Sequence, residues 1–239
     1  MSVEQKIVDP FLARVDTVLG VGYSAVLYGS VARAEYESGV SDVNLMLVVT
    51  QLDHPTLRKL APAFSGWVGN EIPPPLILPR VEWQRASDVF PIEIADMKTG
   101  YRVLRGEDPV ASLRVRARDL RAALEREFRG KLARLRQGFI PSESRPADLG
   151  VLAQHSIGSV VALYRALLSL AKRPVPATRV EVVAAAGALV GFDPAPLVEI
   201  VRHRAEGKWR STPELFEGYL AAVERTVSFV DTFHPGDQE

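Results

Sequence analysis

Two short apolar runs separated by a polar segment constrain the fold of this chain more than any other feature. In the stretch AVLYGSVARAEYESGVSDVNLMLVV, Ala25 to Val49, the first run ends at Gly29-Ser30 and the second begins after Asp42. Apolar runs of this length, bounded by glycine, serine and aspartate, are typical of buried β-strands. Because successive side chains of a strand point to opposite faces, Asp42 and Asn44 should share a face. The stretch therefore predicts two neighbouring strands with a polar corner beside them.

The residue types at this corner suit phosphate and metal ions. A glycine such as Gly29 lets the backbone approach a ligand closely, and Ser30 adds a hydroxyl beside it. The next segment, Val31 to Tyr36, is rich in helix formers, so its first backbone N–H groups would face an anion near Ser30. Asp42 and Asn44 offer oxygen atoms of the kind that Mg²⁺ prefers. The corner thus predicts a site for phosphate and a divalent metal.

Composition limits the classes of protein to which this corner can belong. The chain has 239 residues, of which 47% are hydrophobic, enough for the cores of two small domains. It has no cysteine, which fits a reducing cytoplasm, and we expect a cytoplasmic protein. We identify no apolar run near the ~20 residues that span a bilayer, and no apolar N-terminal signal, so no membrane partner is expected. The 29 basic and 29 acidic residues balance, which does not favour broad binding to nucleic acid.

The two halves of the chain differ in their hydrophobic periodicity. The first half alternates predicted strands with short helices, whereas the second half has helical spacing almost throughout. The segment GEDP, Gly106 to Pro109, brackets two acids with glycine and proline and is the natural boundary. We therefore predict an α+β protein, with a small mixed-sheet domain at residues 1–108 and an all-α helical bundle domain at residues 109–239.

A further acidic residue follows later in the first half. The segment VFPIEI, Val89 to Ile94, is predicted as a strand in which Glu93 lies between two isoleucines. Such a carboxylate faces either water or a site. Asp96 is an alternative acid, although it could instead cap a helix predicted over Met97 to Leu104. We prefer Glu93, because it lies within the strand.

Together these residues resemble the nucleotidyltransferase superfamily, which has a polymerase-beta-like fold and includes the kanamycin-type antibiotic nucleotidyltransferases. The family pattern is an apolar strand ending in Gly-Ser, a short gap, an Asp-x-Asp pair on the next strand, and a third carboxylate on a later strand. LYGS, Leu27 to Ser30, is similar to the first part, Asp42 to the first aspartate, and Glu93 or Asp96 to the third acid. The resemblance departs from the pattern at the second aspartate, where this chain has Asn44.

The resemblance implies an activity with defined partners. It implies transfer of a nucleoside monophosphate from a nucleoside triphosphate (NTP) to a hydroxyl group of an unidentified acceptor, with Asp42 and Glu93 as the catalytic carboxylates. Asp42, Asn44 and Glu93 would then hold Mg²⁺, weakly, since an asparagine supplies one charge fewer than an aspartate. It also implies that the helical domain contacts the acceptor or forms a homodimer interface. Asn44 equally favours an alternative, a catalytically degenerate protein that binds nucleotide or regulates.

Cations are the remaining candidates for nucleotide binding. Gly29 and Ser30 are expected to contact the phosphates together with Arg33, which follows them closely. The first helix predicted in the second half, Leu113 to Gln137, is rich in arginine and also carries Lys131. A run of charge on a helix is usually a solvated face. The alternative is that cations such as Lys131 border the cleft and contact the triphosphate.

Overall fold

The computed structural model divides this chain into two compact units, which are described separately. It describes residues 4–33, 43–68 and 74–234. The first unit comprises residues 1–89 and 100–114, and the second comprises residues 90–99 and 115–239. The division into domains at residues 108 and 109 stays a prediction.

The first unit is built on a four-stranded mixed sheet with the order β3-β2-β1-β4. Its strands are β1 (Tyr23–Tyr28), β2 (Asn44–Val49), β3 (Leu76–Pro79) and β4 (Tyr101–Arg105). β1 pairs antiparallel with both β2 and β4, whereas β2 and β3 run parallel. The two central strands are buried along nearly their whole length, which explains why they appear in the sequence as continuous apolar runs.

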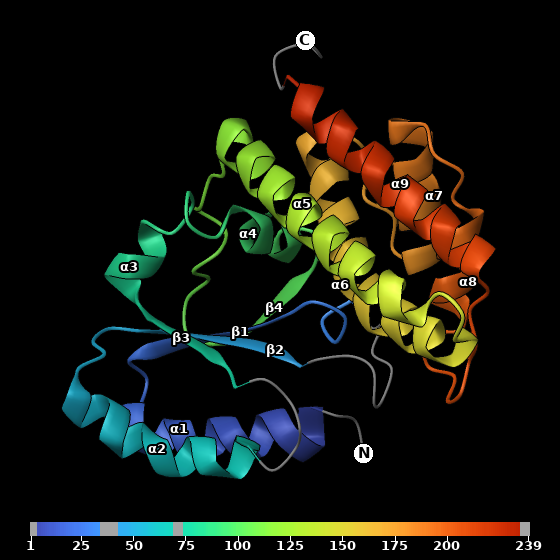
Figure 1. The fold of residues 1–239 in the computed structure, drawn as a ribbon. Helices are drawn as coiled ribbons and strands as arrows, with labels where there is room; N and C mark the ends of the chain where they lie inside the picture. Colours follow the sequence, from blue (N-terminus) through green and yellow to red (C-terminus); the bar gives the residue numbers. More distant parts are fainter. Residues whose placement is uncertain (1–3, 34–42, 69–73, 235–239) are drawn as a thin grey trace. The chain divides into compact units, whose positions relative to one another are not determined.

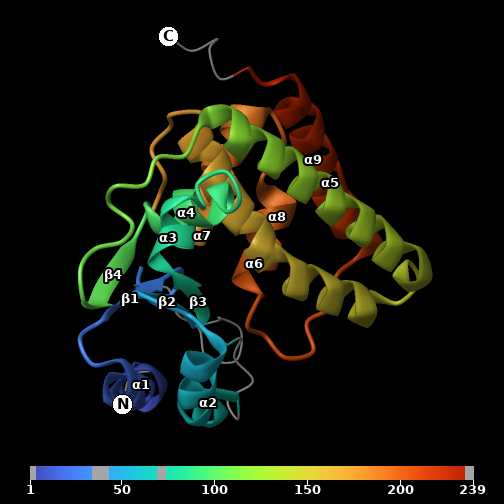
Figure 2. The ribbon, with the colours of Figure 1, turned by 90° about the vertical axis from the view of Figure 1, so that its left-hand side faces the viewer.

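Two helices cover one face of this sheet, as Figures 1 and 2 show. A short π-helix (Glu4–Val8) leads into α1 (Asp9–Leu19), and α1 packs beside α2 (His54–Val68). Alternate strand residues such as Leu27, Leu45 and Leu47 meet apolar residues of α1 and α2 in one core. Because the strands alternate, residues Tyr28 and Asn44 belong to the opposite face.

The described residues of the second unit form helices that share one apolar core. Its helices are α4 (Pro91–Met97), α5 (Ala117–Ser142), α6 (Pro146–Leu170), α7 (Arg179–Val190), α8 (Ala195–Arg202) and α9 (Pro213–Thr232). Aromatic residues Phe128, Tyr164 and Phe216 are fully buried in the shared core. The α+β prediction is confirmed, with a mixed sheet followed by a helical bundle.

By length and composition alone, α6 could cross a membrane, which we did not expect from the sequence. However, 56% of its apolar window is buried inside the structure. Its buried side chains, such as Ile157 and Leu167, contribute to the core of the second unit. This is the burial expected of the central helix of a bundle.

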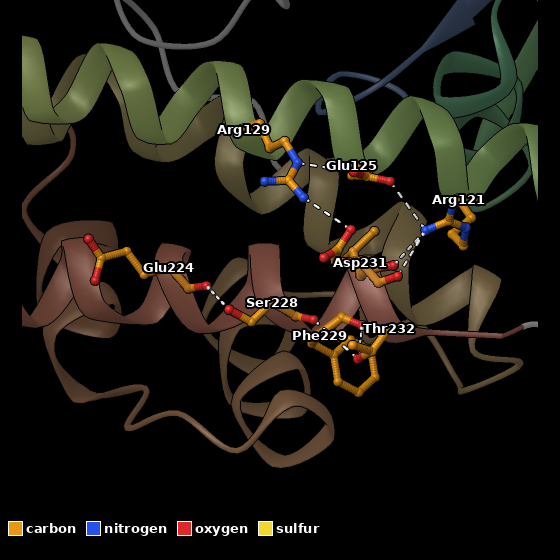
Figure 3. A network of polar contacts seen from close by, with 9 residues as sticks. Arg121, Glu125, Arg129, Glu224, Ser228, Phe229, Asp231 and Thr232 are labelled. Atoms are coloured by element: carbon orange, nitrogen blue, oxygen red, sulfur yellow. Dashed lines mark hydrogen bonds and ion pairs between the residues drawn. The ribbon is translucent and has the colours of Figure 1, made fainter.

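A polar network joins α5 to α9 along the surface of the bundle (Figure 3). Glu125 of α5 accepts hydrogen bonds from Arg121 at 3.2 Å and from Arg129 at 3.0 Å. Arg129 also pairs with Asp231 at 3.0 Å. Arg121 also donates at 3.0 Å to the backbone carbonyl of Val230, near the C-terminal end of α9. Arg121 and Arg129 of α5 therefore link this helix to the C-terminal end of α9.

Two predictions for the segment around Glu93 are wrong. Residues 89–94 do not form a strand, because Pro91 begins the short helix α4, in which Ile94 and Met97 are buried. Proline is favoured in the first turn of a helix, where its missing N–H costs nothing. Residues 97–104 do not form a helix either, since Tyr101 begins β4. Glu93 is consequently carried by a helix in the second unit.

Candidate functional site

The corner predicted from the sequence lies where β1 ends and β2 begins. Gly29 follows the last residue of β1 and has φ of 74°, a left-handed conformation that favours glycine. Asn44 begins β2 and is paired with Tyr28. A Cβ atom placed on Gly29 would lie 2.5 Å from Nδ2 of Asn44. The Asn44 amide therefore packs directly on the Gly29 backbone, and the backbone conformation favours glycine at this position.

The residues that follow form a tight turn. The backbone N–H of Arg33 donates to the carbonyl of Gly29 at 3.2 Å, and Ser30 lies between them, half-buried. Residues 31–33 are in this turn, whereas the rest of the helix predicted over 31–36 lies outside the described residues. Gly29, Ser30 and Arg33 thus share one turn, and their binding of phosphate stays a prediction.

Sequence reasoning missed two residues at this end of the sheet, Gly100 and Tyr101. Tyr101 pairs with Tyr28 across β1 and β4, so Asn44, Tyr28 and Tyr101 form one row. The Tyr101 hydroxyl donates to Asp108 at 2.6 Å, and this hydrogen bond raises the pKa of Tyr101. Gly100 lies under the side chain of Arg33. The alternation in YRVLR between Gly100 and Gly106 was the available signal for β4.

The three predicted metal ligands lie in different parts of the chain. Asp42 lies outside the described residues, and Asn44 is half-buried in the first unit. Glu93 lies in the second unit. Within the described residues, no three side chains among histidine, aspartate and glutamate are grouped so that they could hold a metal ion. The convergence of Asp42, Asn44 and Glu93 on Mg²⁺ therefore stays a prediction.

Two charged candidates of the second unit have shifted pKa values. Although solvent reaches the Glu93 side chain, nearby protein atoms desolvate its carboxyl and raise its pKa, with Glu127 acting in the same direction. Desolvation likewise lowers the pKa of the half-buried Lys131 on α5, and the neighbouring Arg134 adds to this effect. Carboxyls and amines whose charge is poorly solvated are frequent at functional sites. Both residues remain candidates.

A separate hollow of about 500 Å³ lies at the other end of β1, lined in part by Asp16, Tyr23 and Arg105. Tyr23 donates to one Asp16 oxygen at 2.6 Å, and Arg105 donates to the other at 3.3 Å. Burial and the Asp16 hydrogen bond raise the pKa of Tyr23. Asp16 is hydrogen-bonded to both of the other side chains, so this cluster links α1 to β1 and β4.

Comparison with known proteins finds a likeness in structure but none in sequence. The sequence matches no protein-family model and no curated protein. The structure is similar to that of spectinomycin adenyltransferase AAD(9) from Enterococcus faecialis, which was solved with ATP and spectinomycin. The match has a TM-score of 0.55 and 12% sequence identity, and it covers 90% of this chain and 97% of that chain. We conclude that this chain has the polymerase-beta-like fold of the nucleotidyltransferases, as its sequence pattern predicts.

Proposed function

We propose that this protein is a nucleotidyltransferase that moves a nucleoside monophosphate from an NTP to a hydroxyl acceptor. The observation that carries the proposal is the likeness to AAD(9) over almost the full length of both chains. A fold alone does not fix a function. The proposal therefore also depends on the turn from Gly29 to Arg33, whose residue types, a glycine, a serine and an arginine, suit phosphate binding.

In the proposed reaction, each group has a defined role. Gly29, Ser30 and Arg33 bind the triphosphate, with Lys131 as a further cation. The acceptor oxygen attacks the α-phosphorus, the bond to the bridging oxygen of the β-phosphate breaks, and pyrophosphate leaves. The hydroxyl proton passes to one of the two proposed catalytic carboxylates, Asp42 or Glu93.

We further propose that Asp42, Asn44 and Glu93 hold Mg²⁺. Bound Mg²⁺ would neutralise the triphosphate and activate the acceptor hydroxyl. The Asn44 side chain offers an amide oxygen but no charge, so metal affinity should be lower than with aspartate. The contact of its amide with Gly29 supports a role for Asn44 beside the turn that we propose for phosphate binding.

We also propose an acceptor class, a role for the helical unit and a cellular location. The AAD(9) structure holds spectinomycin, so a small hydroxylated molecule of that kind is the first acceptor to test. We propose that the helical unit contacts the acceptor or a second copy of the chain. A cytoplasmic location fits the absence of cysteine.

A second function is favoured by one residue. Asn44 stands where the family pattern has an aspartate, and loss of that charge weakens transfer more than it weakens nucleotide binding. The alternative is therefore a degenerate member that binds nucleotide and regulates a partner.

Calorimetric titration with ATP and GTP, with and without Mg²⁺, tests these proposals. The wild type should bind at least one triphosphate, and Asp42→Ala should weaken the binding that depends on Mg²⁺. No binding to either nucleotide would refute the nucleotidyltransferase proposal. Binding that is independent of metal would favour the regulatory alternative. Transfer activity created by Asn44→Asp would show that the natural protein is an enzyme fold that has lost its activity through this residue.

A further inference from the structure

The position of Arg33 depends on a glycine that is distant in the sequence. Gly100 immediately precedes β4, whose first residue, Tyr101, pairs with Tyr28 of β1. Gly29 follows Tyr28, so Gly29, Arg33 and Gly100 belong to the same end of the sheet. Residues from two separate segments thus meet at the phosphate-binding turn.

The contact leaves no room for a side chain at residue 100. A Cβ atom on Gly100 would lie 2.8 Å from Cγ and 3.4 Å from Cδ of Arg33. These atoms are in the middle of the arginine side chain, so they cannot move aside unless the side chain adopts another rotamer. Such a change of rotamer would displace the guanidinium group at the end of the Arg33 side chain.

The backbone of Gly100 does not explain the glycine. Gly100 is not among the described glycines with positive φ, which are Gly20, Gly29, Gly106 and Gly191. Alanine can therefore adopt the same backbone conformation. What opposes a methyl group at residue 100 is the Arg33 side chain, of which the Nε atom is fully buried.

We propose that Gly100 is a positioning residue for nucleotide binding, which keeps open the space that Arg33 occupies when its guanidinium contacts the triphosphate. This inference rests on the proposed function. It adds to that function a residue outside the sequence pattern described above, which acts only through Arg33. Burial of Nε limits the rotamers that Arg33 can adopt. The contact between Arg33 and Gly100 therefore orders the guanidinium before a phosphate binds.

A double-mutant cycle tests the proposal. Gly100→Ala, Arg33→Ala and the double variant are titrated with ATP and with inorganic tripolyphosphate, which has phosphates but no base. Arg33→Ala should weaken both ligands by about tenfold or more, and Gly100→Ala by about three- to tenfold. The double variant should bind like Arg33→Ala, since the methyl group has nothing left to displace. Gly22→Ala is the matched control in the same unit, because its Cβ would find ordinary contacts, the nearest at 3.4 Å.

Stability gives a second readout that needs no ligand. Gly100→Ala should lower the unfolding temperature, and Arg33→Ala should restore it in the double variant, because it removes Cγ and Cδ. The inference is overturned if Gly100→Ala binds both ligands like the wild type, or if the effects of the two substitutions multiply in the double variant. Failure of the wild type to bind any triphosphate would instead refute the proposed function, and with it this role of Gly100.

Discussion

At the scale of single residues, the candidate site is defined by close approaches that only glycine permits. Asn44 packs on Gly29, and Arg33 packs on Gly100. Each contact brings a polar side chain to the same end of the sheet and fixes it against backbone. A site built in this way is sensitive to the addition of one methyl group.

Gly29→Ala should destabilise the protein by about 1–3 kcal/mol. Alanine at φ of 74° is strained, and its Cβ would also collide with Nδ2 of Asn44. Urea unfolding followed by circular dichroism measures the loss, and nucleotide affinity should fall with it. Gly207→Ala is the control, because its φ is not positive and open space surrounds its Cβ position. Equal stability of the two variants would contradict this account of Gly29.

Glu93→Gln should raise stability at neutral pH, by less than about 1 kcal/mol because solvent still screens the side chain. The folded state raises the pKa of Glu93 above its ordinary value of 4.5, so its charged form costs folding free energy. The stability of the wild type should therefore fall as the pH rises through that raised pKa. Below about pH 4 the carboxyl is protonated in both states, and the variant and the wild type should be equally stable.

The same variant tests the catalytic role of Glu93. If Glu93 is the third acid, Glu93→Gln should lose transfer activity while it gains stability, whereas Asp96→Asn should keep activity. Thermal unfolding at several pH values measures the change in stability of Glu93→Gln. Glu217→Gln is the control, because Glu217 is exposed on α9. Loss of activity in Asp96→Asn alone would transfer the role to Asp96.

At the scale of elements, the sequence predicted the helical bundle and the two central strands but not the segment from Val89 to Arg105. The apolar runs of β1 and β2 and the long periodic helices of the bundle have strong patterns. Around Glu93, by contrast, two isoleucines suggested a strand, while Pro91 in fact begins a helix of only seven residues. A helix so short has too few turns to show a period, and tertiary packing decides its conformation. The contacts of Gly100 and Asn44 could not be predicted, because they depend on strand register.

The polar network of α5 and α9 provides a prediction at this scale. Glu125→Ala should cost about 1–2 kcal/mol, since it removes two ion pairs and leaves Arg121, which is 28% exposed, without its carboxylate. Glu224→Ala removes a single pair to Arg136, in which the side chains are 47% and 57% exposed, and should cost less than about 1 kcal/mol. Urea unfolding at low and high salt measures the loss of stability in both variants. The prediction fails if the two variants lose equal stability.

At the scale of the whole molecule, the residues that we propose for nucleotide and metal binding are divided between the two compact units. Asn44, Arg33 and Gly100 belong to the first unit, whereas Glu93 and Lys131 belong to the second. A nucleotide that contacts residues of both units would stabilise both of them, because a ligand lowers the free energy of every conformation to which it binds. A nucleotide that contacts the first unit alone would leave the second unchanged.

Hydrogen exchange with and without ATP and Mg²⁺ distinguishes these outcomes. We expect ATP to slow exchange in β1, β2 and the Gly29 turn, and also in α4 and around Lys131 in α5, since local opening there would break contacts to the ligand. Arg33→Ala is the control, because loss of phosphate binding should abolish protection in both units at the same ATP concentration. Protection limited to the first unit would exclude Glu93 and Lys131 from the site, and would leave a nucleotide-binding protein whose catalytic acid must be sought among the residues near Asp42.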